Sequence, residues 1–174
     1  QTSIIFAQRL HSEVRLIDYE EESFLRPDEW AKRIIEKPYV YGDHWLPHDG
    51  DHETLQGAGV SLKNQLKPLL GKLPKIIERA QSVEDPIRAA RMMWPRVYMD
   101  EVKCERLMEC LKRFRRNVPE STDEPGVPVK DEYRHGADAY GGLARIVDQL
   151  TNDGREARKL RVDVFVPADA GMGR

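Results

Sequence analysis

Long apolar runs are absent from this chain, and cysteine is scarce. No stretch is long and apolar enough to predict a membrane-spanning helix, and no charged-then-apolar signal segment opens the sequence. The two cysteines, Cys104 and Cys110, are too few for a disulfide scaffold and fit a reducing compartment. These absences argue against a membrane protein and against a disulfide-rich secreted domain.

Two common catalytic motifs are also missing. There is no glycine-rich phosphate loop ending in Lys-Ser or Lys-Thr, so we do not expect the chain to be an ATPase by itself. There is no Gly-x-Ser-x-Gly nucleophile elbow. Cys104 lies on a predicted apolar helix stripe, which indicates a core residue rather than a nucleophile.

What is present fits one globular domain with a tail. The chain has 174 residues, of which 40% are apolar and 33% charged. Its mean hydropathy of -0.65 leans polar, which suggests an unpacked segment. We therefore predict a domain over residues 1–150 and a partly disordered tail over 151–174.

The net charge of -2 hides an uneven distribution. Residues 1–53 carry 6 Lys and Arg against 12 Asp and Glu, residues 54–116 carry 14 against 7, and residues 117–174 carry 8 against 11. A basic middle between acidic flanks is compatible with a phosphate-facing surface beside a metal-binding carboxylate cluster. It is equally the pattern of helices with solvated Lys and Arg faces.

Alternating and aliphatic runs predict the strands. Residues 3–10 and 14–19 have the spacing of an antiparallel hairpin, and residues 20–23 should leave the sheet. A third strand is predicted over 39–46; because a helix precedes it, we expect a parallel crossover. Short strands are predicted at 75–79 and at 97–99, the latter at a sheet edge.

Apolar residues at 3- and 4-residue steps predict five helices. Their expected positions are 27–37, 61–70, 85–93, 100–114 and 135–150. Strands followed by alternating helices and short strands predict a mixed α/β sheet flanked by helices.

The first segment that could carry chemistry is Pro47-His48-Asp49-Gly50. Asp49 follows a predicted strand, and open α/β sheets place their sites at the carboxyl ends of strands. Carboxylate oxygens are preferred Mg²⁺ ligands. Pro, Asp and Gly are also ordinary turn residues, so a turn without any metal-binding role would have the same sequence.

The second segment runs from His135 to Gly142. Asp138 is three residues after His135 and four before Gly142, so all three share one helix face, where a small residue permits close approach. An Asp in a first helical turn is also a common partner of the helix dipole.

The third segment is the basic run that contains Arg113, Arg115 and Arg116 around one aromatic residue. Such a run can meet DNA phosphates. Cations near the end of a helix are also ordinary dipole partners.

Together these segments resemble, in order and spacing, the C-terminal nuclease domain of the large terminase subunit of tailed phages. The resemblance covers roughly residues 3–148. The matching pieces are 14–19, 39–42 with 46–49, 85–91, 98–104, 111–115 and 135–139, the last being similar to the family's Ser-His-x-Ala-Asp-Ala signature.

The resemblance implies an RNase H-like fold and a two-metal endonuclease that cuts double-stranded DNA concatemers during genome packaging. Asp49 and Asp138 would be its catalytic carboxylates and would hold two Mg²⁺ or Mn²⁺ ions. His48 and His135 would orient those carboxylates or contact phosphate. The implied partners are double-stranded DNA, the portal protein and the terminase small subunit, in the cytoplasm of the infected or lysogenic bacterial host.

The chain departs from the family pattern in three respects. The family's first catalytic Asp lies on an opening strand, and no acid here precedes Glu13. Arg134 stands where the signature has Ser, and the ATPase motor is missing. We therefore expect a fragment of a longer chain that lacks the first strand and one metal ligand, and whose activity in isolation is open.

Two alternative hypotheses share part of this interpretation. The chain could be a non-catalytic remnant that binds DNA or the portal, which differs from the enzyme in whether Asp49 matters to cleavage. It could also be a resolvase- or transposase-type nuclease of the same fold, which would lack a fused upstream ATPase.

Overall fold

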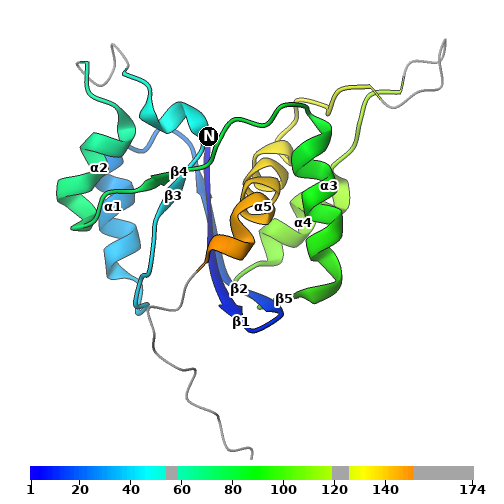
Figure 1. Ribbon diagram of the computed structural model, residues 1–174, viewed down its shortest axis with the longest axis horizontal. Coiled ribbons are helices and arrows are strands. Elements are labelled where there is room, and N and C mark those ends of the chain that lie inside the picture. Colours follow the sequence, from blue (N-terminus) through cyan, green and yellow to red (C-terminus); the bar gives the residue numbers. More distant parts are fainter. Residues whose placement is uncertain (54–58, 119–125, 151–174) are drawn as a thin grey trace, which may run out of the picture.

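Helices cover both faces of a central layer of strands in the computed structural model, which describes residues 1–53, 59–118 and 126–150. Figure 1 shows one group of helices on one side of the strands and a second group on the other. The first group is α1 (Pro27–Glu36) and α2 (Leu62–Leu70); the second is α3 (Glu84–Met93), α4 (Glu105–Arg113) and α5 (Arg134–Ile146). The mixed α/β class with flanking helices is thus confirmed; the expected tail lies outside the described residues.

All five predicted helices are present, with shifted ends. Pro27 occupies the first turn of α1, where its missing N–H costs nothing, and Ser61 caps α2 by accepting a bond from the Asn64 N–H. The helix expected from residue 100 begins only at Glu105, because Asp100 first caps a turn through the Val102 and Lys103 N–H groups. Short 3₁₀ turns complete the set: η1 (His48–Asp51), η2 (Trp94–Arg96) and η3 (Val147–Gln149).

The predicted hairpin is confirmed as β1 (Thr2–Leu10) paired antiparallel with β2 (Glu13–Glu22). The expectation that the chain leaves the sheet after residue 19 is wrong, because Glu20, Glu21 and Glu22 continue the ladder. Their charges are tolerated because Glu20 and Glu21 each have a cationic partner.

A β-bulge in β2 decides which side chains face the core. Phe6 pairs with Asp18 and Ala7 with Leu16, so Ile17 is an extra residue without a partner in β1. The bulge reverses the alternation, so that Leu16 and Tyr19 both join the main core. Asp18 is therefore placed on the opposite face with Phe6.

The strands form two separate sheets. β5 (Val97–Met99) pairs parallel with β2, so the first sheet has the order β1-β2-β5, with β5 at an edge as predicted. The second sheet contains β3 (Trp45–Leu46) and β4 (Lys75–Ile76), which are parallel.

The predicted crossover is wrong, because β3 does not pair with the hairpin and residues 39–44 form no strand. Tyr39 and Tyr41 instead lie against the ring of Phe6, with centroids at 5.7 and 6.2 Å. Their hydroxyls donate to the Asp18 carboxylate and to the Ile34 carbonyl oxygen. Side-chain contacts thus hold this segment across the hairpin where strand pairing was expected.

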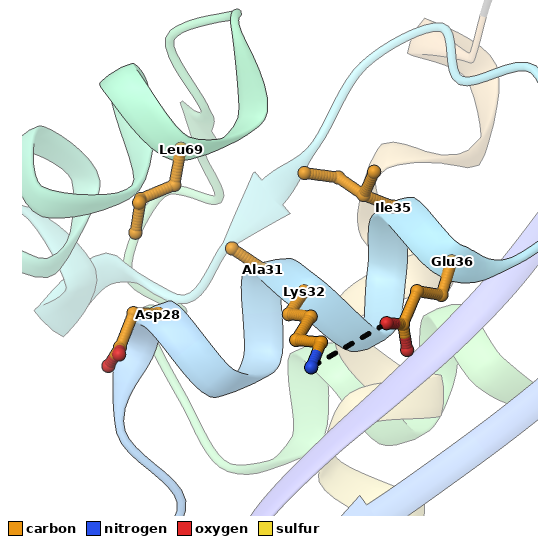
Figure 2. Close-up of a pocket in the computed structure, with 6 residues that line it drawn as sticks. All are labelled: Asp28, Ala31, Lys32, Ile35, Glu36 and Leu69. Atoms are coloured by element: carbon orange, nitrogen blue, oxygen red, sulfur yellow. Dashed lines mark ion pairs between the residues drawn. The ribbon is translucent and has the colours of Figure 1, made fainter.

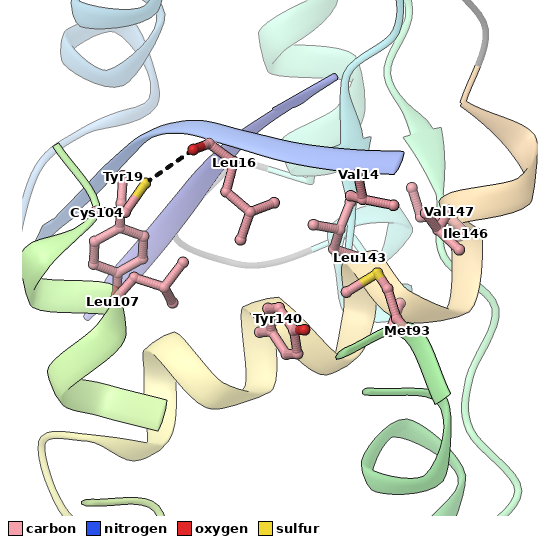
Figure 3. Close-up of a cluster of buried hydrophobic side chains, with 11 residues drawn as sticks. Val14, Leu16, Tyr19, Met93, Cys104, Leu107, Tyr140, Leu143, Ile146 and Val147 are labelled. Atoms are coloured by element: carbon pink, nitrogen blue, oxygen red, sulfur yellow. Dashed lines mark hydrogen bonds between the residues drawn. The ribbon is translucent and has the colours of Figure 1, made fainter. Parts of the chain in front are cut away.

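The main core lies between the first sheet and α5 (Figure 3). Val14, Leu16 and Leu107 are at most 1% exposed, and Tyr140 of α5 packs among the same side chains. Cys104 is fully buried and its thiol donates to the Leu16 carbonyl oxygen at 3.4 Å, which confirms the expected core role. Burial also raises the pKa of Cys104 to about 11, so the sulfur stays a thiol.

Two glycines of α5 provide a matched test of this packing. A Cβ on Gly136 would lie 2.8 Å from Cys110 Cβ and 2.9 Å from the Tyr19 hydroxyl, whereas one on Gly142 would meet only the end of Ile77 at 3.3 Å. We expect Gly136→Ala to lower the free energy of unfolding by roughly 1–2 kcal/mol, because overpacking outweighs the helix-propensity gain. Gly142→Ala should be neutral or stabilising by up to about 1 kcal/mol. Urea denaturation of both variants measures the difference; equal effects would contradict it.

Candidate metal and DNA-binding site

Asp49 lies in the 3₁₀ turn η1, just beyond the end of β3. Pro47 precedes the turn, and the buried Gly50 packs against Leu46, where an added Cβ would come within 2.8 Å of the Leu46 Cβ. The Asp49 side chain is exposed and has no partner among the described residues. The segment is a turn, as its Pro, Asp and Gly residues suggest, and it places an exposed carboxylate just after the carboxyl end of a strand.

Asp138 lies in the second turn of α5, on the solvent side. Its carboxylate accepts a hydrogen bond from Arg134 Nε at 3.1 Å, one helical turn earlier, and its side chain is 56% exposed. His135 is also exposed and forms no described contact with Asp138. In this structure, Arg134 rather than His135 is the neighbour that balances the Asp138 charge.

The parallel pair β3–β4 and the residues directly after it contact both the strand that precedes Asp49 and the helix that bears Asp138. The Ile77 N–H donates to the Leu46 carbonyl oxygen at 2.8 Å, directly before the segment that bears Asp49. Gly142 of α5 packs against Ile77, and Arg145 Nη1 donates to the Glu78 carbonyl oxygen at 2.6 Å. In Figure 1, the cyan segment after β3 and the yellow start of α5 both lie in the upper half of the view.

The donor set fits a divalent metal only in part. Within residues 1–53, 59–118 and 126–150, no three His, Cys, Asp or Glu side chains are grouped to hold an ion. His48 lies 6.2 Å from the ring of His52. Mg²⁺ commonly uses one or two carboxylates together with substrate phosphates, and Asp49 and Asp138 are each exposed carboxylates. They do not form a preformed two-ion centre.

The acids at the end of β2 are engaged elsewhere. Arg106 Nε donates to Glu21 Oε1 at 2.6 Å, and the Tyr19 hydroxyl donates to Glu21 Oε2 at 2.6 Å. Burial and the Glu21 hydrogen bond raise the pKa of Tyr19, so the phenol keeps its proton. Glu21 therefore serves to join β2 to α4 and is a poor metal ligand.

A buried ionic cluster on the far face of the hairpin was not predicted from the sequence. Lys37 Nζ lies 2.7 Å from Asp18 Oδ2 and 2.5 Å from Glu20 Oε1, and the Tyr39 hydroxyl donates to Asp18 at 3.1 Å. Lys103 Nζ donates in turn to the Tyr39 hydroxyl at 2.9 Å. An Asp within a strand was the available signal, but its partner lies 19 residues away and no local pattern identifies it.

Hydrogen bonds set the ionisation of this cluster. Burial alone would raise the pKa of Asp18, but the bonds from Lys37, from Tyr39 and from the Tyr19 N–H outweigh it and lower that pKa. The two carboxylates likewise raise the pKa of Lys37 against the effect of burial. Asp18 and Lys37 are therefore both charged at neutral pH, and their pair acts as a structural link between β2 and the end of α1.

The three arginines predicted to contact DNA all have partners within the chain. Arg113 pairs with Glu109 at 3.1 Å and donates to the Tyr133 hydroxyl at 2.7 Å. Arg115 lies 3.7 Å from Asp131, and Arg116 pairs with Glu84 of α3. The run thus ties α4 to neighbouring elements, and its charge is largely balanced.

A shallow hollow between α1 and α2 contains neither candidate metal ligand. Figure 2 shows its lining, in which Ile35 and Leu69 face each other across a gap and the Lys32–Glu36 ion pair lies at the rim. Neither histidines nor cysteines line it. We assign it no chemistry.

Comparison with protein-family models, with curated proteins and with solved structures finds no match for this chain. In the part of the chain that the structure describes, no helix is both long and apolar enough to cross a membrane.

Proposed function

We propose that this chain is a metal-dependent endonuclease domain that cuts double-stranded DNA. The supporting observation is that Asp49 lies on a turn directly after β3, while Asp138 lies on α5, whose Gly142, one turn further along, packs against Ile77 directly after β4. Carboxylates from a strand end and from a late helix are the ligands of RNase H-like nucleases, so the proposal includes that fold.

The chain's own residues would contribute position and charge. Asp49 is held by a turn that packs on β3, and Asp138 by a helix with a buried inner face, so both carboxylates have fixed backbones. Paired divalent ions, when bound, would activate water and stabilise the leaving oxygen. Arg134 must move away from Asp138 before this carboxylate can bind an ion.

The resemblance extends the proposal to the biological role. By it, the substrate is concatemeric phage DNA, and the portal protein and the terminase small subunit are partners in the cytoplasm of the bacterial host. The non-catalytic alternative is favoured by one observation, the lack of a third ligand among the described residues. The two differ in cleavage, and the non-catalytic module would bind DNA or the portal instead.

A nicking assay separates them. Supercoiled plasmid is incubated with the 174-residue chain and Mg²⁺ or Mn²⁺, with EDTA as the metal-free control, and duplex binding is measured in parallel. We expect metal-dependent conversion of supercoiled to nicked plasmid, abolished by EDTA. Binding without nicking would support the non-catalytic module, and absence of both would refute the DNA-directed proposal altogether.

A further inference from the structure

The segment 77–83, which links β4 to α3, is fixed at both ends. Arg145 Nη1 holds the Glu78 carbonyl oxygen at 2.6 Å. At the other end, the N–H and hydroxyl of Ser82 donate to the Asp85 carboxylate at 2.8 and 2.9 Å. Figure 1 shows this segment running along the edge of the fold where α5 begins. A side chain between the anchors is presented from a defined backbone.

Exposed arginines lie along this segment and on α3, and none of them forms an ion pair among the described residues. Arg79 lies between the two anchors, and Arg91 lies on α3; both are exposed and have no partner among the described residues. Arg88 is exposed one turn before Arg91, and its charge acts on Asp85, whose pKa is lowered chiefly by Ser82. We call Arg79, Arg88 and Arg91 the cationic ridge.

The inner side of α3 is occupied by packing, which directs the ridge outward. Pro86 packs against Gly141 of α5, where an added Cβ would lie 2.9 Å from Pro86 Cβ, and Met93 is 2% exposed. Glu84, the acid at the start of α3, is paired with Arg116. Pairing with Arg116 removes Glu84 from the balance, so the three ridge cations exceed the two other nearby acids, Glu78 and Asp85, by one charge.

An arginine without an ion-pair partner contributes more binding free energy to a DNA phosphate than an arginine that is already paired. A cation without a protein partner can neutralise a phosphate and release a condensed counterion, which drives binding. A paired cation must first lose its carboxylate, so its gain is smaller. By this criterion the ridge is a better phosphate-binding surface than Arg113, Arg115 and Arg116.

We propose that the cationic ridge binds the phosphate backbone of the duplex and leads it toward the segments that carry Asp49 and Asp138. This proposal rests on the proposed function, since it assumes a DNA substrate, and it replaces the basic run at the end of α4 as the main contact surface. Because the contacts are to phosphate, binding is independent of base sequence.

The ridge also contains its own opposing charge. Glu78 is exposed next to Arg79, its backbone is anchored by Arg145, and its carboxylate has no partner among the described residues. If a phosphate approaches Arg79, this carboxylate repels it. Glu78→Gln should therefore tighten duplex binding by roughly two-fold at low salt.

The test is fluorescence anisotropy of a short labelled duplex, titrated with the full chain at several salt concentrations without divalent metal. Arg79→Ala and the double variant Arg88→Ala/Arg91→Ala should each weaken binding by roughly five-fold or more. Each lost phosphate contact should also lower the salt-dependence slope by about 0.9. Lys32→Ala, on α1 in the opposite helix layer, is the matched control and should behave as the unmodified chain.

Arg115→Ala distinguishes the two surfaces. Weaker binding in the ridge variants with little change in Arg115→Ala supports the ridge. Tight binding retained in both ridge variants, or a larger loss in Arg115→Ala, overturns it while leaving the proposed function intact. If the unmodified chain binds no duplex, both the ridge and the proposed function fail.

Discussion

A Lys37→Met variant is expected to lose about 3 kcal/mol of the free energy of unfolding. Methionine keeps most of the length of the side chain but removes the ammonium group that contacts Asp18 and Glu20. The Asp18 side chain is only 9% exposed, so water cannot replace that contact at full strength. The two carboxylates would also repel each other across one strand face. Urea denaturation at neutral pH measures the loss.

Two further variants show whether burial of the charge causes this loss. Lys32→Met removes an exposed ammonium that pairs with Glu36 at 3.8 Å, and it should cost no more than about 0.5 kcal/mol. Adding Asp18→Asn to Lys37→Met should restore part of the stability, because the unpaired buried charge is gone. Equal losses of stability in Lys37→Met and Lys32→Met would show that the buried cluster stabilises the fold no more than an exposed ion pair does.

The same cluster predicts an acid-side dependence of stability. The pKa of Asp18 is lower in the folded chain than its ordinary value of 3.8. Its contribution is therefore complete above about pH 4 and is lost as the pH falls through the folded value. Asp18→Asn should flatten this part of the stability profile. An unchanged acid limb in that variant would contradict the assigned ion pair.

Local patterns were sufficient for the helices and for the hairpin. Proline at residue 27, serine at residue 61 and apolar steps of three and four each act within one or two helical turns, so the sequence predicts them directly. The prediction of a strand over 39–46 was wrong because its outcome depends on distant residues. Its aromatic residues match a strand pattern, but whether a backbone pairs or packs depends on Phe6 and Asp18 across the fold.

Charged residues were harder to predict, because their partners are distant in sequence. The arginines at the end of α4 have a DNA-binding composition, yet Glu84 and Asp131 on other elements balance two of them. The free cations Arg79 and Arg91 stand out only when the ion pairs are known. Asp49 and Asp138 were proposed from their local sequence alone, and their role as metal ligands stays a prediction; the structure shows Asp49 just after β3 and Asp138 on the exposed side of α5.

If the proposed function is right, Asp49→Asn and Asp138→Asn should each reduce metal-dependent nicking by at least about 100-fold. A bound ion contributes several kcal/mol of transition-state stabilisation, and each 1.4 kcal/mol is a factor of ten in rate. Both side chains are exposed, so neither substitution should change stability by more than about 0.5 kcal/mol. The measurements are plasmid nicking, denaturation, and the Mn²⁺ EPR signal with a short duplex present.

The chain provides a control for each acid. Asp51 lies two residues after Asp49 in the same 3₁₀ turn and pairs with Lys63, and Asp148 follows α5 at its other end, near Arg9 and Arg96. Asp51→Asn and Asp148→Asn should leave both nicking and Mn²⁺ binding unchanged. Nicking that persists with Mn²⁺ in Asp49→Asn would refute the assignment of Asp49 as a ligand.

Arg134→Ser tests whether the Arg134–Asp138 ion pair competes with metal binding. Removing the guanidinium that contacts Asp138 should increase Mn²⁺ binding in the presence of duplex, because the carboxylate no longer has to break an ion pair first. The gain should disappear in the double variant Arg134→Ser/Asp138→Asn, since it acts through that carboxylate alone. A gain that survives in the double variant would mean that the ion binds elsewhere, and Asp138 would then be only the helix-surface partner of Arg134.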